Sequence, residues 1–357
     1  MECKTVPSID EAKGQAESLV ITKLSSNENP FGPSPKAVAA AQSAVRSASR
    51  YPERTDSKLC DTLAAFHRRG LATAHFFSAN GGVEVLSLVE DALIHPGQRA
   101  IICPPCFGGY SQSLSNKRCE IDKVPLVGSG FDLDVDAILC AVTEETRLVY
   151  LSNPNNPTGT WFGGNPLKEV LDRLPEHVTV IYDEVYYQFA TEEGLPDAIR
   201  HVLDGRNIVI VHSFSKAYGL AGMRLGYGIA PQRTAQKVQK LKRSFHLSNP
   251  GMEAAMAALE DTSHLQRTVE NNHVERRRLL ERLSELSLEV TPSQANFVMF
   301  RCPEGYDAEE LTTVLAKRGV MVRPAFYLPH HIRVTIGTPD DNTRLLTSLA
   351  QFCRVEG

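Results

Sequence analysis

The stretch NIVIVHSFSKAYGLAGMRLGY, residues 207–227, sets the interpretation of the whole chain. Its β-branched run at 208–211 predicts a buried strand. Ser213, Ser215 and Lys216 follow the carboxyl end of that strand. Open α/β sheets bind their ligands at this end of the strands, so we expect the three side chains to line a binding site.

Arg224 follows Lys216 by eight residues, within a segment that carries glycines at 219, 222 and 226. Glycines let the backbone turn, so the guanidinium can return to the neighbourhood of the lysine. An amine, hydroxyls and a guanidinium together suit a ligand that has both an aldehyde and a phosphate. Pyridoxal 5′-phosphate has both groups, and its aldehyde bonds covalently to a lysine amine.

A second interpretation of SFSK, residues 213–216, is the S-x-x-K motif of β-lactamases and penicillin-binding proteins, with Ser213 as the nucleophile. Those enzymes also carry S-D-N and K-T-G, and neither tripeptide occurs in this sequence. We therefore interpret Lys216 as a cofactor-binding residue.

Length and charge narrow the class of protein. The 357 residues suffice for one large and one smaller domain. A formal net charge of −4 gives no basic surface for nucleic acid, so we expect a small-molecule substrate. The amino terminus lacks the apolar core of a secretory signal, and no apolar run has the length of a membrane span. We expect a cytoplasmic protein.

Eight cysteines are spread along the chain, which is typical of free thiols in a reducing compartment. Cys103 and Cys106 enclose two prolines in the form of a redox motif. A redox site would begin a helix there, whereas the sequence at 107–110 predicts a loop. There is no second cysteine pair and no H-E-x-x-H, so we expect no metal site.

Strands and helices alternate between residues 75 and 212, which predicts an α/β fold with a mostly parallel, doubly wound sheet. We expect an amino-terminal arm with part of a small domain at 1–45. A large domain should follow at 46–245, and a small α+β domain at 246–357. The strand-end loops of the sheet should converge on one cleft.

Two of these loops carry groups that suit a ligand. Gly81 and Gly82 open a helix at Val83 after a strand, where free N–H groups favour a phosphate. Asn156 lies within PNNPTG, residues 154–159, and the prolines on both sides hold it as a fixed hydrogen-bond donor.

Two strands end with, or contain, a charged candidate. Asp183 follows an apolar strand at 178–182, and Tyr186 is three residues further on. A carboxylate at that point is either solvated or buried beside a cation. Arg333 lies at the inward phase of an alternating strand at 332–337, where a guanidinium is costly without an anion. We therefore expect Arg333 to bind a carboxylate.

Short segments of this chain, in order over nearly its whole length, resemble the fold type I pyridoxal-phosphate aminotransferases, and most closely the histidinol-phosphate aminotransferases. The segments are SSNENPFGPSP (25–35), RYP (50–52), NGGVE (80–84), PNNPTG (154–159), DEVY (183–186), SFSK (213–216), GMRLGY (222–227), ANF (295–297), VRP (322–324) and IRVTIGT (332–338).

The resemblance implies a catalytic set of Lys216, Asp183 and Tyr186. Lys216 is implied to hold the cofactor as a Schiff base and, once freed, to carry a proton between the substrate α-carbon and the cofactor. Asp183 is implied to pair with the pyridine nitrogen of the cofactor. Tyr186 and Asn156 are implied to hydrogen-bond the 3′ oxygen of its ring.

The resemblance also implies a phosphate site made by Ser213, Arg224 and the amides of Gly82 and Val83. Tyr51 is implied to reach that phosphate from the neighbouring subunit, which requires a homodimer.

The remaining implied contacts concern the cofactor ring and the substrate. Phe107 occupies the position of the aromatic ring that stacks on the cofactor. Arg333 and Arg323, together with Asn156, are implied to bind the substrate phosphate in one half-reaction and the carboxylates of 2-oxoglutarate in the other.

The implied activity moves an amino group from a donor, first L-histidinol phosphate, to 2-oxoglutarate by a ping-pong mechanism in histidine biosynthesis. The family usually carries Pro-Tyr-x-Pro-Gly near its amino terminus, whereas VPSID at 6–10 has no tyrosine. An aromatic or specialised biosynthetic amino acid is therefore an alternative donor. A decarboxylase or oxidase of the same fold is a further alternative, as is a non-catalytic sensor, which would need a DNA-binding domain before residue 25.

Overall fold

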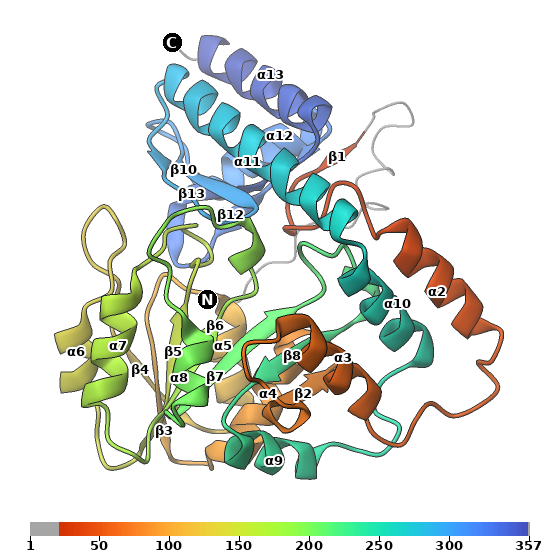
Figure 1. Ribbon diagram of the computed structural model, residues 1–357. Helices are drawn as coiled ribbons and strands as arrows, with labels where there is room; N and C mark the ends of the chain where they lie inside the picture. The colour runs from red at the N-terminus through yellow and green to blue at the C-terminus, as the bar shows by residue number, and fades with distance from the viewer. Residues whose placement is uncertain (1–20, 356–357) are drawn as a thin grey trace.

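A seven-stranded sheet forms the centre of the larger part of the molecule (Figure 1). The computed structural model describes residues 21–355. β8 is antiparallel to both of its neighbours, and the other neighbouring strands are parallel. In sheet order the strands are β2 (Phe76–Ala79), β8 (Gly226–Ile229), β7 (Ile208–Ser213), β6 (Thr179–Asp183), β5 (Thr146–Ser152), β3 (Arg99–Ile102) and β4 (Glu120–Lys123). The predicted α/β fold with a mostly parallel sheet is confirmed.

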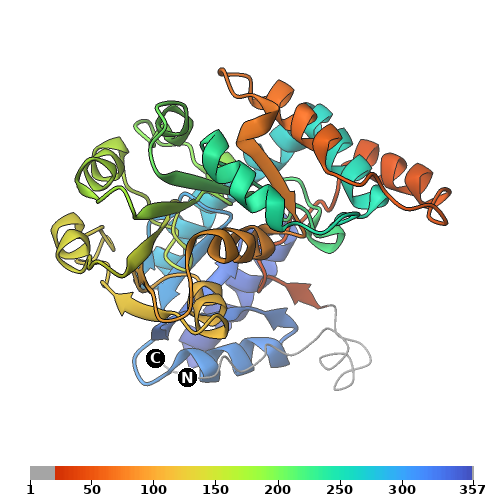
Figure 2. The same cartoon turned by 90° about the horizontal axis from the view of Figure 1, so that it is seen from below.

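Helices cover both faces of this sheet because its strands are apolar on both sides (Figure 2). Along β7, Ile208 and Ile210 belong to one core, and Val209 and Val211 belong to the other, since successive side chains point to opposite faces. The first core includes side chains of α3 (Ser57–His67), α6 (Val135–Cys140), α7 (Gly164–Arg173) and α8 (Ala198–Leu203). The second includes side chains of α4 (Gly82–Leu93), α5 (Gly108–Asn116) and α9 (Gln232–Leu241).

A smaller antiparallel sheet is built by the carboxyl-terminal part of the chain, which is blue in Figure 1. Its order is β12 (Arg323–Ala325), β13 (Leu328–Thr335), β10 (Phe297–Arg301) and β9 (Val290–Thr291). A separate core joins it to α11 (Thr262–Glu285), α12 (Ala308–Lys317) and α13 (Pro339–Val355). Within residues 21–355, no helix combines the length and the apolar character that crossing a membrane requires.

The first described residues pack with the carboxyl-terminal part of the chain in this smaller unit. β1 (Thr22–Lys23) pairs in parallel with β11 (Val320–Met321), and Leu24 lies in the same core as α12 and α13. Residues 1–20 of the predicted amino-terminal arm lie outside the described residues, and these include the VPSID stretch at 6–10. The described part of this segment therefore packs with the carboxyl-terminal unit.

α2 (Pro35–Val45) and α10 (Asn249–Glu260) pack against each other, and both contribute to the core of the large sheet. The domain boundaries at 46 and 245 stay a prediction. We propose that both helices belong to the large domain, because their buried side chains share its core.

The cysteine pair near β3 has buried, free thiols. The prediction of a loop at 107–110 was wrong, because α5 begins at Gly108. Burial raises the pKa of Cys106 to about 12 and also raises that of Cys103. Both thiols are therefore protonated at neutral pH and lack the thiolate that redox chemistry needs.

A buried ion pair connects α3, β2 and the end of α9. Lys242 contacts Asp56, and the side chains are 5% and 6% exposed, respectively. Asp56 also accepts a hydrogen bond of 2.9 Å from the backbone N–H of Ser78. Burial by itself would raise the pKa of Asp56, but Lys242 and Ser78 outweigh it and lower the pKa to about 2.

We expect Asp56→Asn to lower the free energy of unfolding by about 3–5 kcal/mol, because it leaves Lys242 buried without a counter-charge. Urea denaturation at pH 7 measures this loss. Lys58→Gln, which breaks an exposed pair with Glu253 next to the same helix, should cost less than about 1 kcal/mol. Since the folded pKa of Asp56 is depressed, its contribution is present above pH 4 and is lost as the pH falls towards 2. Equal losses in the two variants would contradict this account.

Candidate active site

A cavity of about 250 Å³ lies at the carboxyl ends of β5, β6 and β7. Most of the predicted site residues line it: Gly82, Val83, Phe107, Asn156, Asp183, Tyr186, Ser213, Lys216 and Arg224. Ser26 and Glu28 of the amino-terminal segment also line it, and the sequence analysis did not single them out. Arg323, Arg333 and Tyr51 are not part of this lining.

Lys216 follows β7 and lies in the cavity wall. Its Nζ donates a hydrogen bond of 3.2 Å to the carbonyl of Ser26 and lies 5.7 Å from the centre of the Tyr186 ring. Burial, and then the nearby charge of Arg333, lower the pKa of Lys216 to about 8. An appreciable fraction of this lysine is therefore a neutral amine near neutral pH, which is the form that attacks an aldehyde.

Asp183 ends β6 with a buried carboxylate. Its Oδ2 accepts a hydrogen bond of 2.6 Å from the hydroxyl of Tyr110, and its Oδ1 accepts one of 3.2 Å from the N–H of Val185. Burial raises the pKa of Asp183, and these hydrogen bonds oppose the rise. The carboxylate is thus held in a fixed orientation beside the cavity, where it suits a protonated ring nitrogen.

Tyr110 was missed by the sequence analysis. It lies in the first turn of α5, three residues after Phe107, and this spacing puts the two side chains on one helix face. Their rings are in edge contact at 5.5 Å. The spacing could have identified Tyr110 only if a helix had been predicted there.

Tyr186 is hydrogen-bonded through its hydroxyl to the amino-terminal segment and to the loop after β5. Its hydroxyl accepts hydrogen bonds from the side-chain amides of Asn27 at 3.1 Å and Asn156 at 3.4 Å. Asn27 has a φ of 55°, and its backbone N–H donates to Thr335 at 2.8 Å. Asparagine tolerates this left-handed backbone better than most residues. The asparagine in SSNENP was therefore a local sign of a turn that could have drawn attention to Asn27.

The start of α4 forms an anion cradle with Arg224 and Ser213. The Arg224 guanidinium donates to the carbonyls of Ala221 at 2.9 Å and Asn80 at 3.3 Å. A side chain at Gly81, whose φ is +90°, would clash with that guanidinium. Gly81 also has a backbone conformation that L side chains rarely adopt, so glycine is favoured at the start of this helix, where free N–H groups can bind an anion. The arrangement suits a phosphate group.

Arg333 and Arg323 are directly opposite each other in the register of β12 and β13. Side chains that are opposite in an antiparallel pair lie on one face, and like charges there are unfavourable. Arg333 donates to Asn156 Oδ1 at 2.7 Å and to the Ser25 carbonyl at 2.9 Å. Burial first, and then Arg323, lower the pKa of Arg333 to about 10. A bound anion would relieve this unfavourable pair of cations.

Tyr51 lies away from the cavity of its own chain. It is 83% exposed, and its ring lies 5.0 Å from that of Phe245, which is also exposed. The structure of the single chain therefore does not bring Tyr51 to the predicted phosphate site.

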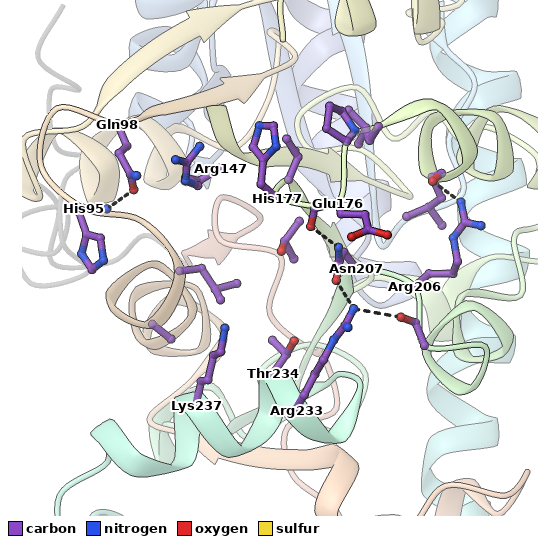
Figure 3. A pocket seen from close by; sticks show the side chains of 18 of the residues that line it. His95, Gln98, Arg147, Glu176, His177, Arg206, Asn207, Arg233, Thr234 and Lys237 are labelled. Carbon is purple, nitrogen blue, oxygen red and sulfur yellow. Dashed lines mark hydrogen bonds between the residues drawn. The ribbon is translucent and has the colours of Figure 1, made fainter. Parts of the chain in front are cut away.

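A larger cavity, of about 820 Å³, lies at the amino-terminal ends of β5, β6 and β7 (Figure 3). Its arginines already have partners: Arg206 pairs with Asp172 at 2.8 Å, Arg233 donates to Asn207 at 2.6 Å, and Arg147 donates to the backbone carbonyl of Glu144 at 2.7 Å. None of the predicted site residues lines it. The smaller cavity is the better candidate, because it brings together side chains whose pKa values are shifted.

The family model for aminotransferases of class I and II matches residues 20–349. The chain is 38% identical to a histidinol-phosphate aminotransferase of Akkermansia muciniphila over 333 residues, which cover 93% of this chain and 90% of the relative. It is 35% identical to one of Geobacillus thermodenitrificans, with 97% and 94% covered.

Among solved structures, the histidinol-phosphate aminotransferase of Sinorhizobium meliloti in complex with pyridoxal 5′-phosphate matches with a TM-score of 0.89 and 26% identity. The match covers 99% of this chain and 96% of that chain. Since the family model spans nearly the whole sequence and the relatives match over more than nine-tenths of it, this chain belongs to the class I and II aminotransferase family.

Proposed function

We propose that this protein is a pyridoxal-phosphate aminotransferase that moves the amino group of L-histidinol phosphate to 2-oxoglutarate, as a step in histidine biosynthesis. One observation carries the proposal. A lysine with a lowered pKa, a buried carboxylate and an anion cradle line the same cavity. The names of the relatives support the choice of donor.

The residues present fit pyridoxal 5′-phosphate. Lys216 would bond to its aldehyde, and Asp183 would pair with its ring nitrogen. Tyr186 and Asn156 would hydrogen-bond its 3′ oxygen, and Phe107 would stack on its ring. The amides of Gly82 and Val83, with Ser213 and Arg224, would hold its phosphate. When bound, this cofactor supplies the electron sink that makes the α-proton of an amino donor removable.

The side chains around the cofactor perform the proton transfers. Once its amine is free, Lys216 would take the proton from the α-carbon of the amino donor and hold it for return. Its lowered pKa makes both directions accessible near neutral pH. Asp183, held in orientation by the Tyr110 hydroxyl, would keep a proton on the ring nitrogen of the bound cofactor.

The pair Arg323 and Arg333 supports an anionic donor and an anionic acceptor. Two guanidinium groups on one face of the small sheet match a phosphate monoester in one half-reaction. They match the second carboxylate of a dicarboxylic oxo acid in the other. Asn156 orients Arg333 through the hydrogen bond at 2.7 Å.

Purified holoenzyme should lose its visible cofactor band when L-histidinol phosphate is added alone, and 2-oxoglutarate should restore it. Lys216→Ala should lower turnover at least about 10²-fold, since positioned proton transfer contributes this much or more. Lys237→Ala, which lies in the larger cavity, is the matched control and should retain turnover. Bleaching by phenylalanine but not by histidinol phosphate would leave transamination intact and refute the donor.

Attachment of pyridoxal 5′-phosphate to the cofactor-free protein should follow the neutral fraction of Lys216. Because the neutral amine dominates above its pKa, the rate should rise with pH up to about 8 and then level off. A lysine with the ordinary pKa of about 10.4 would instead give a rate that keeps rising to pH 10. Stopped-flow absorbance measures the rate. Arg333→Gln should move the plateau to higher pH, because this arginine helps to lower the pKa.

The homodimer belongs to the same proposal. Tyr51 and Phe245 form an exposed aromatic pair, and Tyr51 would reach the cofactor phosphate of the neighbouring subunit. Sedimentation equilibrium should give twice the mass of one chain, and Tyr51→Ala should weaken cofactor retention. A monomeric wild type would contradict this arrangement, and so would a Tyr51→Ala variant that retains the cofactor as tightly as the wild type. Cytoplasmic location stays a prediction.

A further inference from the structure

Phe326 occupies the turn between β12 and β13, at the edge of the small sheet that faces the large domain. Its ring makes edge contact with the ring of Phe107, with centres 6.0 Å apart and planes at 80°. Phe107 also lines the candidate cavity. One side chain of the small unit thus touches the residue that would stack on the cofactor.

The same ring faces both substrate arginines. The Cζ of Arg323 lies 4.7 Å from the centre of the Phe326 ring, and the Cζ of Arg333 lies 5.9 Å from it. Both distances are within the range of cation–π attraction. Since Arg323 and Arg333 are opposite in register, the negative face of the ring offsets part of their mutual repulsion.

The position of the ring is set by contacts with α5. A side chain added at Gly108 would come 3.2 Å from Phe326 Cδ1, so the turn packs closely on the helix start. The neighbouring Tyr327 hydroxyl lies 2.9 Å from the hydroxyl of Ser111, within hydrogen-bond distance. The turn is therefore anchored to α5 of the large domain through two consecutive residues, Phe326 and Tyr327.

We propose that Phe326 is a positioning residue, which orients Arg323 beside Arg333 so that the pair binds the anionic group of the substrate. This inference rests on the proposed function for the identity of that group, a phosphate monoester or the distal carboxylate of an oxo acid. The ring holds the guanidinium of Arg323 in place before the anion arrives. Because the Arg323 side chain is already ordered, it loses less conformational entropy when the anion binds.

Two substitutions distinguish the effect of the aromatic face of Phe326 from the effect of its apolar volume. Phe326→Leu keeps an apolar side chain and removes the aromatic face, whereas Phe326→Tyr keeps the face. Calorimetric titration of the holoenzyme with inorganic phosphate, and separately with succinate, reads anion binding without turnover. We expect Phe326→Leu to raise the dissociation constant of these anions by about 2- to 30-fold. Phe326→Tyr should stay within about twofold of the wild type.

Steady-state kinetics supply the second readout. For histidinol phosphate, Phe326→Leu should raise KM by a similar factor with little change in kcat, because the group acts on binding. A double-mutant cycle with Arg323→Gln tests whether Phe326 acts on anion binding through Arg323. In that background, Phe326→Leu should have almost no further effect on anion binding.

Three outcomes would overturn the inference: an unchanged anion dissociation constant in Phe326→Leu, an equal loss in Phe326→Tyr, or additive effects with Arg323→Gln. Failure of the wild type to bind either anion would also overturn it. Failure of the proposed donor is distinguishable, since the anion titrations would then show the Phe326 effect while histidinol phosphate left the cofactor band unchanged.

Discussion

The parallel pairing of β6 with β7 is the constraint on which the site depends. In this register Asp183 is paired with Val211. The Asp183 carboxylate and the segment Ser213–Lys216 therefore lie at the same end of the strands, the carboxyl end. Successive side chains alternate between the two apolar cores, and a slip of one residue would turn Asp183 towards the core that contains Tyr182. The carboxylate would lose the Tyr110 hydroxyl and be buried without a partner, which is costly.

The site is completed by segments that are distant in the sequence. Asn27 hydrogen-bonds Tyr186 of the large sheet, and its backbone N–H donates to Thr335 of the small one. The Ser25 carbonyl and Asn156 together hold Arg333. The segment at 25–29 therefore joins the lysine side of the cavity to the arginine side, and the orientation of each side depends on the other.

The strand ends were predictable, and so was the start of α4, which was expected at Val83 and lies at Gly82, because apolar runs and glycine pairs are local signals. The prediction failed at 107–110, where two consecutive glycines suggested a loop and the structure has the first turn of α5. A side chain at Gly109 would clash with the Phe107 ring, and one at Gly108 would press closely on Phe326, so both glycines suit this close packing. A helix that opens with two glycines runs against their low helix propensity, which favours a loop. Tyr110 was missed for the same reason.

The sequence by itself determined the α/β fold, because alternating apolar strands and helices are local signals. It also pointed to several residues that line the cavity, such as Asp183 and Ser213, because they lie at the ends of apolar strands. Only the tertiary structure decided which partner each residue meets: Tyr110 with Asp183, Asn27 with Tyr186, and Phe326 with Arg323 and Arg333. It also left Tyr51 exposed on its own chain. The physical reason is that these contacts join residues far apart along the chain, so they depend on strand register and core packing and not on local periodicity.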